Sequence, residues 1–228
     1  WEDYLTVINS FSIQVKIRNS QNINNSHFAK LRIKDAIVDY FSDKYGERPN
    51  VKIKDPDIPI NVYINNSSVK VYLNSSGNPL FKRNYRTKVH KASLNEVYAA
   101  GLLQLSQWDK ESPLVDPMCG SGTFVIEAAM MLNNIPSGFF RKYFAFMKWQ
   151  NFDPTLFAKV IDKCKAAIVK NNSVKILAND ISETSISLCR ETIKRFGKLI
   201  NIEITNRNFR FMNIINSHII SNPPYGKR

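Results

Sequence analysis

A short glycine turn in the middle of the chain constrains the fold more than any other feature. Residues 113–131 read PLVDPMCGSGTFVIEAAMM, which predicts a short strand ending at Asp116 and an apolar helix from about Thr123. Gly120 and Gly122 between them allow a sharp turn and a close approach of a ligand, which a Cβ would hinder. The start of the helix offers unpaired N–H groups and a field that favours an anionic group. Such a unit opens the ligand site of α/β proteins, at the carboxyl ends of parallel strands.

The chain after this turn alternates between short apolar strands and helices. We expect strands at 174–178, 202–204 and 219–220, and a helix over 182–196. Another helix begins at Asp153-Pro154 and is expected to bury one apolar face. This alternation predicts an α/β domain built on an open parallel sheet.

The first eighty residues have a different pattern. Apolar and polar residues alternate over 11–17, 58–64 and 69–73, which predicts three half-buried strands, the last two joined as a hairpin. A helix with an imperfect apolar face is expected over 27–43. Strands and helix segregated in this way predict a small α+β domain.

The chain carries a formal net charge of +13, and the excess is shared by its two halves. A nucleic acid is the leading candidate partner, although a composition rich in Asn, Lys and Ile can also raise the charge without function. The run 82–91, KRNYRTKVHK, is basic and contains no acid, so it could be a solvated linker or a contact to a nucleic-acid backbone. We favour the second interpretation, with five RNA-binding candidates: Lys82, Arg83, Tyr85, Arg86 and Lys88.

Several classes of protein are disfavoured. The three cysteines lack CxxC spacing and the three histidines do not cluster, so we predict neither a metal site nor a disulfide framework. No apolar run approaches the roughly 18 residues needed to span a bilayer, and there is no signal-peptide pattern, so no membrane partner is expected. A cytoplasmic location is the default expectation.

Three polar residues, Ser93, Glu96 and Asp180, flank the expected site. Ser93 and Glu96 have the spacing of a capping box, in which each side chain caps the start of the next helix. Asp180 follows the second strand, where a carboxylate can accept both ribose hydroxyls. It lies far beyond the roughly 20 residues of the dinucleotide fingerprint, and the third glycine is missing, so a dehydrogenase is disfavoured.

Asn222-Pro223-Pro224-Tyr225 is the most specific motif. An exocyclic amino group on a nucleobase is a poor nucleophile, because its lone pair is delocalised into the ring. The Asn222 side-chain oxygen and the Pro223 carbonyl could accept its two N–H bonds, and neither proline donates an N–H. Tyr225 offers a ring on which an extracted base can stack. An ordinary turn is the alternative, but the preceding strand, glycine turn and acid favour function.

Six stretches together resemble one known family: LRIKDAIVDYF and PDIPINVYI in the first domain, SGNPLFKRNYR in the connector, and ASLNEVYAAGL, DPMCGSGTFVIEAAM and SNPPYG in the second domain. They resemble the THUMP-containing class I methyltransferases, which use S-adenosylmethionine to methylate guanine N2 in large-subunit ribosomal RNA. The resemblance covers essentially the whole chain, and its last two stretches are highly specific. It implies a Rossmann-like class I methyltransferase sheet preceded by a small α+β THUMP domain. The expected parts are a THUMP domain over 1–80, a basic connector over 81–92 and a methyltransferase domain over 93–228.

The resemblance also implies roles for individual residues. The methionine part of S-adenosylmethionine would be held by Asp116, Pro117, Met118, Cys119, Gly120, Ser121, Gly122 and Thr123. Asp180 would hold the ribose, and Asn208 stands where the family usually has an adenine-contacting Asp, so that contact is weaker and uncharged. The motif that closes over the cofactor corresponds to Leu94, Asn95 and Glu96. The target base would be held by Asn222, Pro223, Pro224 and Tyr225.

The resemblance further leads us to expect a fragment. The family's N-terminal ferredoxin-like subdomain would begin before Trp1, and the chain ends at Arg228, just past the fourth strand of a seven-stranded sheet. Two other functions stay open: adenine-N6 methylation of DNA or RNA, since the Asn-Pro-Pro-Tyr motif suits that amino group equally well, and non-catalytic RNA binding. The hairpin of the first domain favours RNA over DNA.

Overall fold

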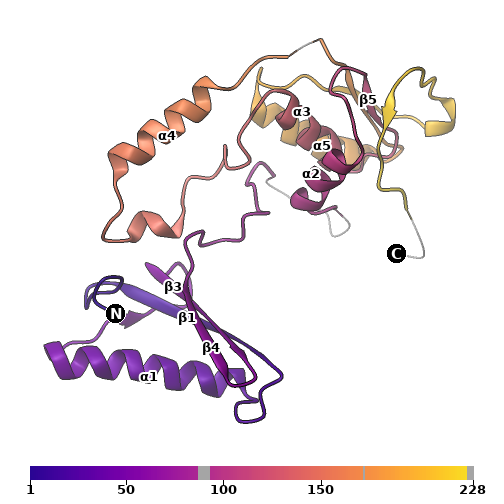
Figure 1. The fold of residues 1–228 in the computed structure, drawn as a ribbon. Helices are drawn as coiled ribbons and strands as arrows, with labels where there is room; N and C mark the ends of the chain where they lie inside the picture. The colour runs from indigo at the N-terminus through magenta and orange to yellow at the C-terminus, as the bar shows by residue number, and fades with distance from the viewer. Residues whose placement is uncertain (87–92, 172, 225–228) are drawn as a thin grey trace. The chain divides into compact units, whose positions relative to one another are not determined.

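The computed structural model describes residues 1–86, 93–171 and 173–224 (Figure 1). The chain forms two compact units, Trp1–Pro79 with Lys142–Leu156, and Leu80–Arg141 with Phe157–Arg228. This division differs from the expected domains at two points. Residues 142–156 belong to the first unit, and the described part of the basic connector belongs to the second. Within the described residues, no helix is long and apolar enough to cross a membrane.

The first unit is a four-stranded sheet with one long helix. Its elements are β1 (Ser10–Arg18), α1 (Ser26–Tyr45), β2 (Asn50–Val51), β3 (Ile58–Asn65), β4 (Ser68–Leu73) and the short 3-10 helix η1 (Ala145–Lys148). The strand order is β2-β1-β3-β4, with β1 parallel to both of its neighbours. β3 and β4 form the expected antiparallel hairpin, and Asn66 at its tip has a φ of 53°.

The helix α1 covers one face of this sheet (Figure 1). It begins at Ser26, and its N-cap is Asn25, whose side chain accepts the Phe28 N–H at 3.0 Å. It ends before Gly46, which adopts the left-handed conformation. Its buried residues pack on the alternate residues of β1 and β3 that point the same way: Ala29, Ile37, Val38 and Phe41 against Phe11, Ile13, Ile58, Ile60, Val62 and Ile64. The α+β prediction is therefore confirmed.

The second unit is an open parallel sheet. Its strands are β5 (Leu114–Asp116), β6 (Ile176–Asn179), β7 (Glu203–Thr205) and β8 (His218–Ile219), in the order β7-β6-β5-β8 and all parallel. Its helices are α2 (Glu96–Leu105), α3 (Thr123–Leu132) and α5 (Glu183–Phe196), together with the 3-10 helix η2 (Phe209–Phe211). Because β5 lies between β6 and β8, the glycine turn that follows it lies at the middle of the sheet's carboxyl edge.

The helix α3, which follows the glycine turn, is the core of this unit. Every residue of α3 except Met131 is buried, including Glu127. By contrast, α4 (Pro154–Ala166) buries no residue, so the expectation that it packs an apolar face into the core is wrong. Its apolar side chains are spaced for a helix face, but Phe157, Ile161 and Cys164 are only half-buried.

Candidate functional site

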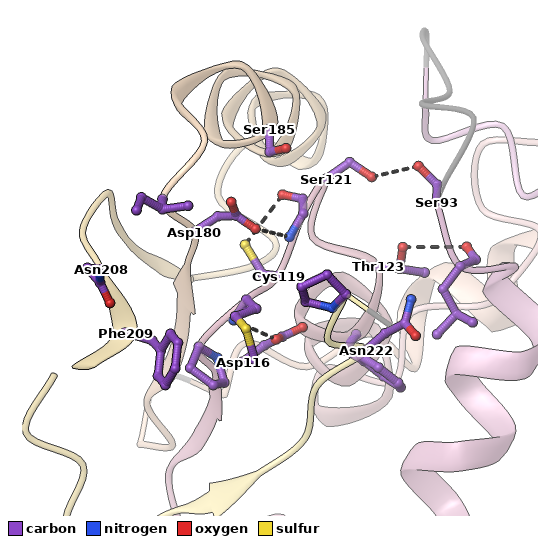
Figure 2. A pocket seen from close by; sticks show the side chains of 17 residues that line it. Ser93, Asp116, Cys119, Ser121, Thr123, Asp180, Ser185, Asn208, Phe209 and Asn222 are labelled. Atoms are coloured by element: carbon purple, nitrogen blue, oxygen red, sulfur yellow. Dashed lines mark hydrogen bonds between the residues drawn. The ribbon is translucent and has the colours of Figure 1, made fainter. Parts of the chain in front are cut away.

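A pocket of about 420 Å³ lies in the second unit, at the carboxyl ends of its strands (Figure 2). Most of the residues that the resemblance assigned to the cofactor line it: Leu94, Asp116, Pro117, Met118, Cys119, Gly120, Ser121, Thr123, Asp180 and Asn208. Asn222 and Pro224, which were assigned to the target base, line it too. They come from loops that are widely separated along the chain. Parallel strands bring these loops to one edge, because every strand of the sheet ends on the same side.

Asp116 is the most buried acid of the pocket. It is 1% exposed, and its Oδ1 accepts the Met118 N–H at 3.2 Å. Burial, together with the nearby charge of Asp180, raises the pKa of Asp116 to about 7. The carboxyl therefore exchanges its proton near neutral pH, and a cation bound beside it favours the ionised form.

The two glycines of the turn have different roles. Gly120 (φ +55°) has no atom within 4 Å of the position of a Cβ, and its N–H donates to Asp180 Oδ2 at 2.8 Å. Gly122 (φ +83°) is the N-cap of α3 and packs against Cys189 of α5, whose Sγ a Cβ would strike. Gly122 does not line the pocket. Its close approach is to another helix of the protein.

Asp180 and its neighbour Asn179 hold the turn in place. Asp180 Oδ1 accepts the Ser182 N–H at 2.9 Å while Oδ2 accepts from Gly120, so this carboxylate joins the glycine turn to the start of α5. Asn179 is fully buried, and its amide nitrogen donates to the Pro117 and Arg207 carbonyls at 2.9 and 3.0 Å. Its Oδ1 accepts from the Thr205 hydroxyl at 2.8 Å. Sequence reasoning missed this role of Asn179.

The loops after β6 and β7 supply an apolar wall. Ile181 and Phe209 line the pocket and are substantially exposed, while Asn208 is the N-cap of η2 and accepts the Arg210 N–H at 3.1 Å. Sequence reasoning also missed five lining residues: Ser93, Phe124, Ile181, Ser185 and Phe209. Each lies within two residues of a predicted position except Ser185, so proximity to the motifs was the available signal.

The segment after β8 closes another side of the pocket. Asn222 and Pro224 both line the cavity, and Figure 2 shows Asn222 among the lining side chains. Pro223 is exposed and does not line it. Tyr225 lies outside the described residues, so the structure does not place its ring.

The start of α2 differs from the capping box that the sequence predicted. α2 begins at Glu96 with Asn95 as its N-cap, whose side chain accepts the Val97 N–H at 2.9 Å. Ser93 is two residues too early to cap, and its hydroxyl shares a hydrogen bond of 3.0 Å with Ser121 of the glycine turn. Of the three residues in the expected closing motif, Leu94 lines the pocket, whereas Asn95 and Glu96 do not.

The described part of the basic connector, up to Arg86, packs against α3, which contradicts part of the predicted RNA-binding set. Tyr85 is 0% exposed and its hydroxyl donates to Glu127 Oε1 at 3.0 Å, so its ring has no face for a base. Arg83 Nε lies 2.8 Å from the same oxygen. Burial raises the pKa of Glu127 to about 7, against the opposing charge of Arg83. The sequence does contain a signal for this packing. Glu127 is the only charged residue in the apolar helix α3, and a buried charge needs partners of opposite charge or hydrogen-bond donors.

Arg86 also binds groups within the protein. Its side chain is 4% exposed, with Nη1 3.6 Å from Glu96 Oε1, and Nη2 donates to the Thr123 hydroxyl. The side chains of Arg83 and Arg86 therefore pair with acids inside the protein, and the prediction that they bind RNA is wrong. Lys82 is exposed and stays a predicted RNA contact, while Lys88 lies outside the described residues.

The electrostatics of the pocket restrict what it can bind. Two carboxylates, Asp116 and Asp180, face it, and none of its described lining residues is Lys or Arg. A polyphosphate would meet two like charges and no cation, whereas a ligand with positive groups would be stabilised. Among the described residues, no group of three His, Cys, Asp or Glu could hold a metal ion.

Proteins that resemble this chain in sequence and fold include methyltransferases. The profile described as "RMKL-like, methyltransferase domain" matches residues 83–228, and the THUMP domain profile matches residues 1–74. The "Ribosomal RNA large subunit methyltransferase K/L" of Psychromonas ingrahamii is 38% identical over 237 residues, covering 100% of this chain and 31% of that protein. That of Pseudoalteromonas atlantica is 37% identical, covering 100% of this chain and 33% of that protein. The chain thus spans about a third of these curated relatives.

Two solved structures share the fold over the whole chain. The crystal structure of SMU.472 complexed with SAH has a TM-score of 0.87 and 30% identity, and this chain covers 60% of it. A predicted N6-adenine-specific DNA methylase from Listeria monocytogenes has a TM-score of 0.86 and 27% identity, with the same coverage. These comparisons confirm the class I methyltransferase fold, the THUMP domain and S-adenosylmethionine as the cofactor of the family. The chain belongs to the family of RMKL-like methyltransferase domains and carries a THUMP domain before it.

Proposed function

We propose that this chain is the RNA-recognition and cofactor-binding part of a methyltransferase that modifies the N2 amino group of a guanine in large-subunit ribosomal RNA. One observation carries the proposal. The Asn222 side chain lines the same pocket as two carboxylates and a glycine turn, and that pocket has no described cation. A site with acids for a positively charged cofactor and an amide acceptor for an amino group suits methyl transfer from a sulfonium.

The pocket residues fit S-adenosylmethionine. The sulfonium and the amino group of this cofactor are positive, which matches Asp116 and Asp180. Its carboxylate is favoured by the N–H groups at the start of α3. Asp180 would accept the ribose hydroxyls, and Asn208, with Ile181 and Phe209 as apolar walls, would hold the adenine.

The chain's own part in the reaction is to orient the acceptor amino group. The Asn222 side-chain oxygen and the Pro223 carbonyl would accept the two N–H bonds and draw them out of the plane of the base. The nitrogen lone pair would then be less delocalised and could attack the methyl carbon. The new nitrogen–carbon bond would form as the sulfur–carbon bond breaks, SAH would leave, and the amino group would lose one proton to solvent. S-adenosylmethionine supplies an activated methyl group, so the transfer needs no covalent enzyme intermediate, and positioning provides most of the rate enhancement.

Substitution of Asn222 tests the proposal. In a protein that contains this chain, we expect Asn222→Ala nearly to abolish methyl transfer while SAH binding, measured by calorimetry, stays within about twofold. The matched change Asp180→Ala should weaken SAH binding instead. Unchanged turnover in Asn222→Ala would show that Asn222 does not orient the amino group. Unchanged SAH affinity in Asp180→Ala would show that Asp180 does not bind the ribose.

Adenine-N6 methylation is the second candidate, favoured by the description of the Listeria monocytogenes structure. Both target atoms are exocyclic amino groups, so the pocket geometry suits each. Mass spectrometry of nucleosides from cells with and without the gene separates them: loss of N2-methylguanosine supports the proposal, and loss of N6-methyladenosine supports the alternative. If neither nucleoside changes and SAH does not bind, non-catalytic RNA binding remains.

A further inference from the structure

The sheet of the first unit has one face that α1 does not cover. Along β3 the residues alternate strictly between buried and half-buried, and the buried set packs under α1. The other set points to the opposite face, because successive side chains of a strand alternate between faces. At the start of β1 both faces are buried, but Gln14, Lys16 and Arg18 near its end are exposed. The uncovered area is therefore the half of the sheet near the hairpin.

Strand register arranges this uncovered area in rows. Lys16 of β1 pairs with Tyr63 of β3, and Tyr63 pairs with Lys70 of β4. The next row on the same face is Arg18, Asn65 and Ser68, and the row on the other side is Gln14, Asn61 and Tyr72. We call the five cationic and aromatic members the basic face: Lys16, Arg18, Tyr63, Lys70 and Tyr72.

The basic face combines charge with aromatic surface. Its three cations are exposed, Tyr72 is 50% exposed and Tyr63 is half-buried. The three rows contain no acid, and within the described part of the chain Lys16, Arg18 and Lys70 form no ion pair. Asn65 Oδ1, in the second row, is buried and has no hydrogen-bond partner. These cations thus differ from Arg83 and Arg86, which are neutralised within the protein.

We infer that the basic face binds a single-stranded segment of RNA. The inference rests on the proposed function, since it names the surface with which the first unit would hold the substrate. Adjacent strands are about 4.8 Å apart, so a row of three residues spans about 10 Å. Exposed tyrosines can stack on bases while Lys and Arg neutralise the flanking phosphates. In duplex RNA the bases are stacked within the helix and unavailable to the rings, so the face favours single strands.

The first test is the salt dependence of binding, measured by fluorescence anisotropy with a single-stranded oligouridylate. The variant Lys16→Gln/Arg18→Gln/Lys70→Gln removes all three cations of the basic face. Each phosphate contact contributes about 0.7 to the slope of log K against log salt, so the slope should fall by about 2. The control is Lys30→Gln/Arg32→Gln/Lys34→Gln, which makes the same charge change on α1, across the sheet. Its slope should stay close to that of the unchanged chain, and equal slopes for the two variants would overturn the inference.

The second test removes an aromatic ring. Tyr72→Ala should weaken binding of the single strand by roughly tenfold, since stacking contributes ~1–3 kcal/mol per base. Tyr45→Ala is the matched control, because Tyr45 lies on α1 and is 49% exposed. Binding of duplex RNA of the same length should respond less to Tyr72→Ala than binding of the single strand. Equal losses in Tyr72→Ala and Tyr45→Ala would overturn the aromatic part of the inference.

The outcomes separate this inference from the proposed function. SAH binding to the second unit should be unchanged in every variant, and circular dichroism should show that each variant folds. If the unchanged chain binds RNA and the basic-face variants bind equally well, only the location is wrong. If the unchanged chain binds no RNA, both the basic face and the RNA substrate are refuted, even where SAH binds.

Discussion

Substitution of Gly122 tests how the glycine turn is packed. In Gly122→Ala the new methyl group meets two penalties: a φ of +83° and the Sγ of Cys189. Cys189 is fully buried on α5, so its thiol has little room to move aside. Gly120→Ala is the matched control, because Gly120 also has a positive φ of +55° but has no atom within 4 Å of its Cβ position.

The two substitutions differ in expected magnitude. A left-handed conformation costs an L-residue about 1–2 kcal/mol, and this is the whole expected effect for Gly120→Ala. Overpacking adds about 1–3 kcal/mol, so Gly122→Ala should lower the free energy of unfolding by roughly 2–5 kcal/mol. At about 2–4 °C per kcal/mol for a chain of this size, its Tm should fall by roughly 4–20 °C, and that of Gly120→Ala by roughly 2–8 °C.

A double mutant isolates the clash. Thermal unfolding followed by circular dichroism gives the Tm of Gly122→Ala, Cys189→Ala and the double variant. Removal of the sulfur leaves the Cys189 Cβ at 3.5 Å from the new methyl group, an ordinary contact. The two substitutions together should therefore be less harmful than the sum of their separate effects, by about 1–3 kcal/mol. Additive effects, or equal losses for Gly122→Ala and Gly120→Ala, would refute the packing argument.

Three further predictions concern buried polar groups. Arg83→Met should destabilise the second unit by about 3–5 kcal/mol, since it leaves Glu127 buried without its cation. The pKa of Glu127 is raised to about 7, so the stability of this variant should be greatest at low pH. From pH 6 to 8 its stability should fall more steeply than that of the unchanged chain, which differential scanning fluorimetry can measure. Asp116 has a pKa of about 7, so the affinity for cationic S-adenosylmethionine should increase as the pH rises from 6 to 8. Calorimetry in buffers of different ionisation enthalpy should detect the proton that is released on binding. An affinity that does not change with pH would contradict this assignment. Asn179→Ala should lower the free energy of unfolding by about 1–3 kcal/mol and weaken SAH binding, whereas a change in stability alone would limit Asn179 to a structural role.

The elements set by local pattern could be predicted from the sequence. The strand before Asp116 and the helix Thr123–Leu132 appear where the apolar pattern and the glycines place them. The hairpin of β3 and β4 follows from alternation on either side of an Asn-Ser turn. These features depend on neighbours within a few residues, and the sequence displays those neighbours directly.

Features that depend on distant partners were harder to predict. The connector was interpreted as a free basic run, but Glu127, some forty residues later, pairs with Arg83 and Tyr85. The predicted capping box failed because Ser93 bonds to Ser121 of the glycine turn and Asn95 caps the helix instead. In both cases the basic run or the capping-box spacing is present in the sequence, but a contact with a distant residue in the folded chain determines the role of these side chains.

From the sequence alone we could predict a glycine turn after a short apolar strand, an acid after the next strand and an Asn-Pro-Pro-Tyr motif after a later one. These are the residues to which the family resemblance assigns the cofactor and the target base, and their identity does not depend on the fold. The tertiary structure decided which charges remain available. It buries Arg83 and Arg86 against acids and leaves Lys16, Arg18 and Lys70 unpaired on one face of the first unit. The charge of a side chain follows from its residue type, which the sequence gives. Whether that charge is neutralised depends on acids distant in the sequence that come into contact only when the chain folds.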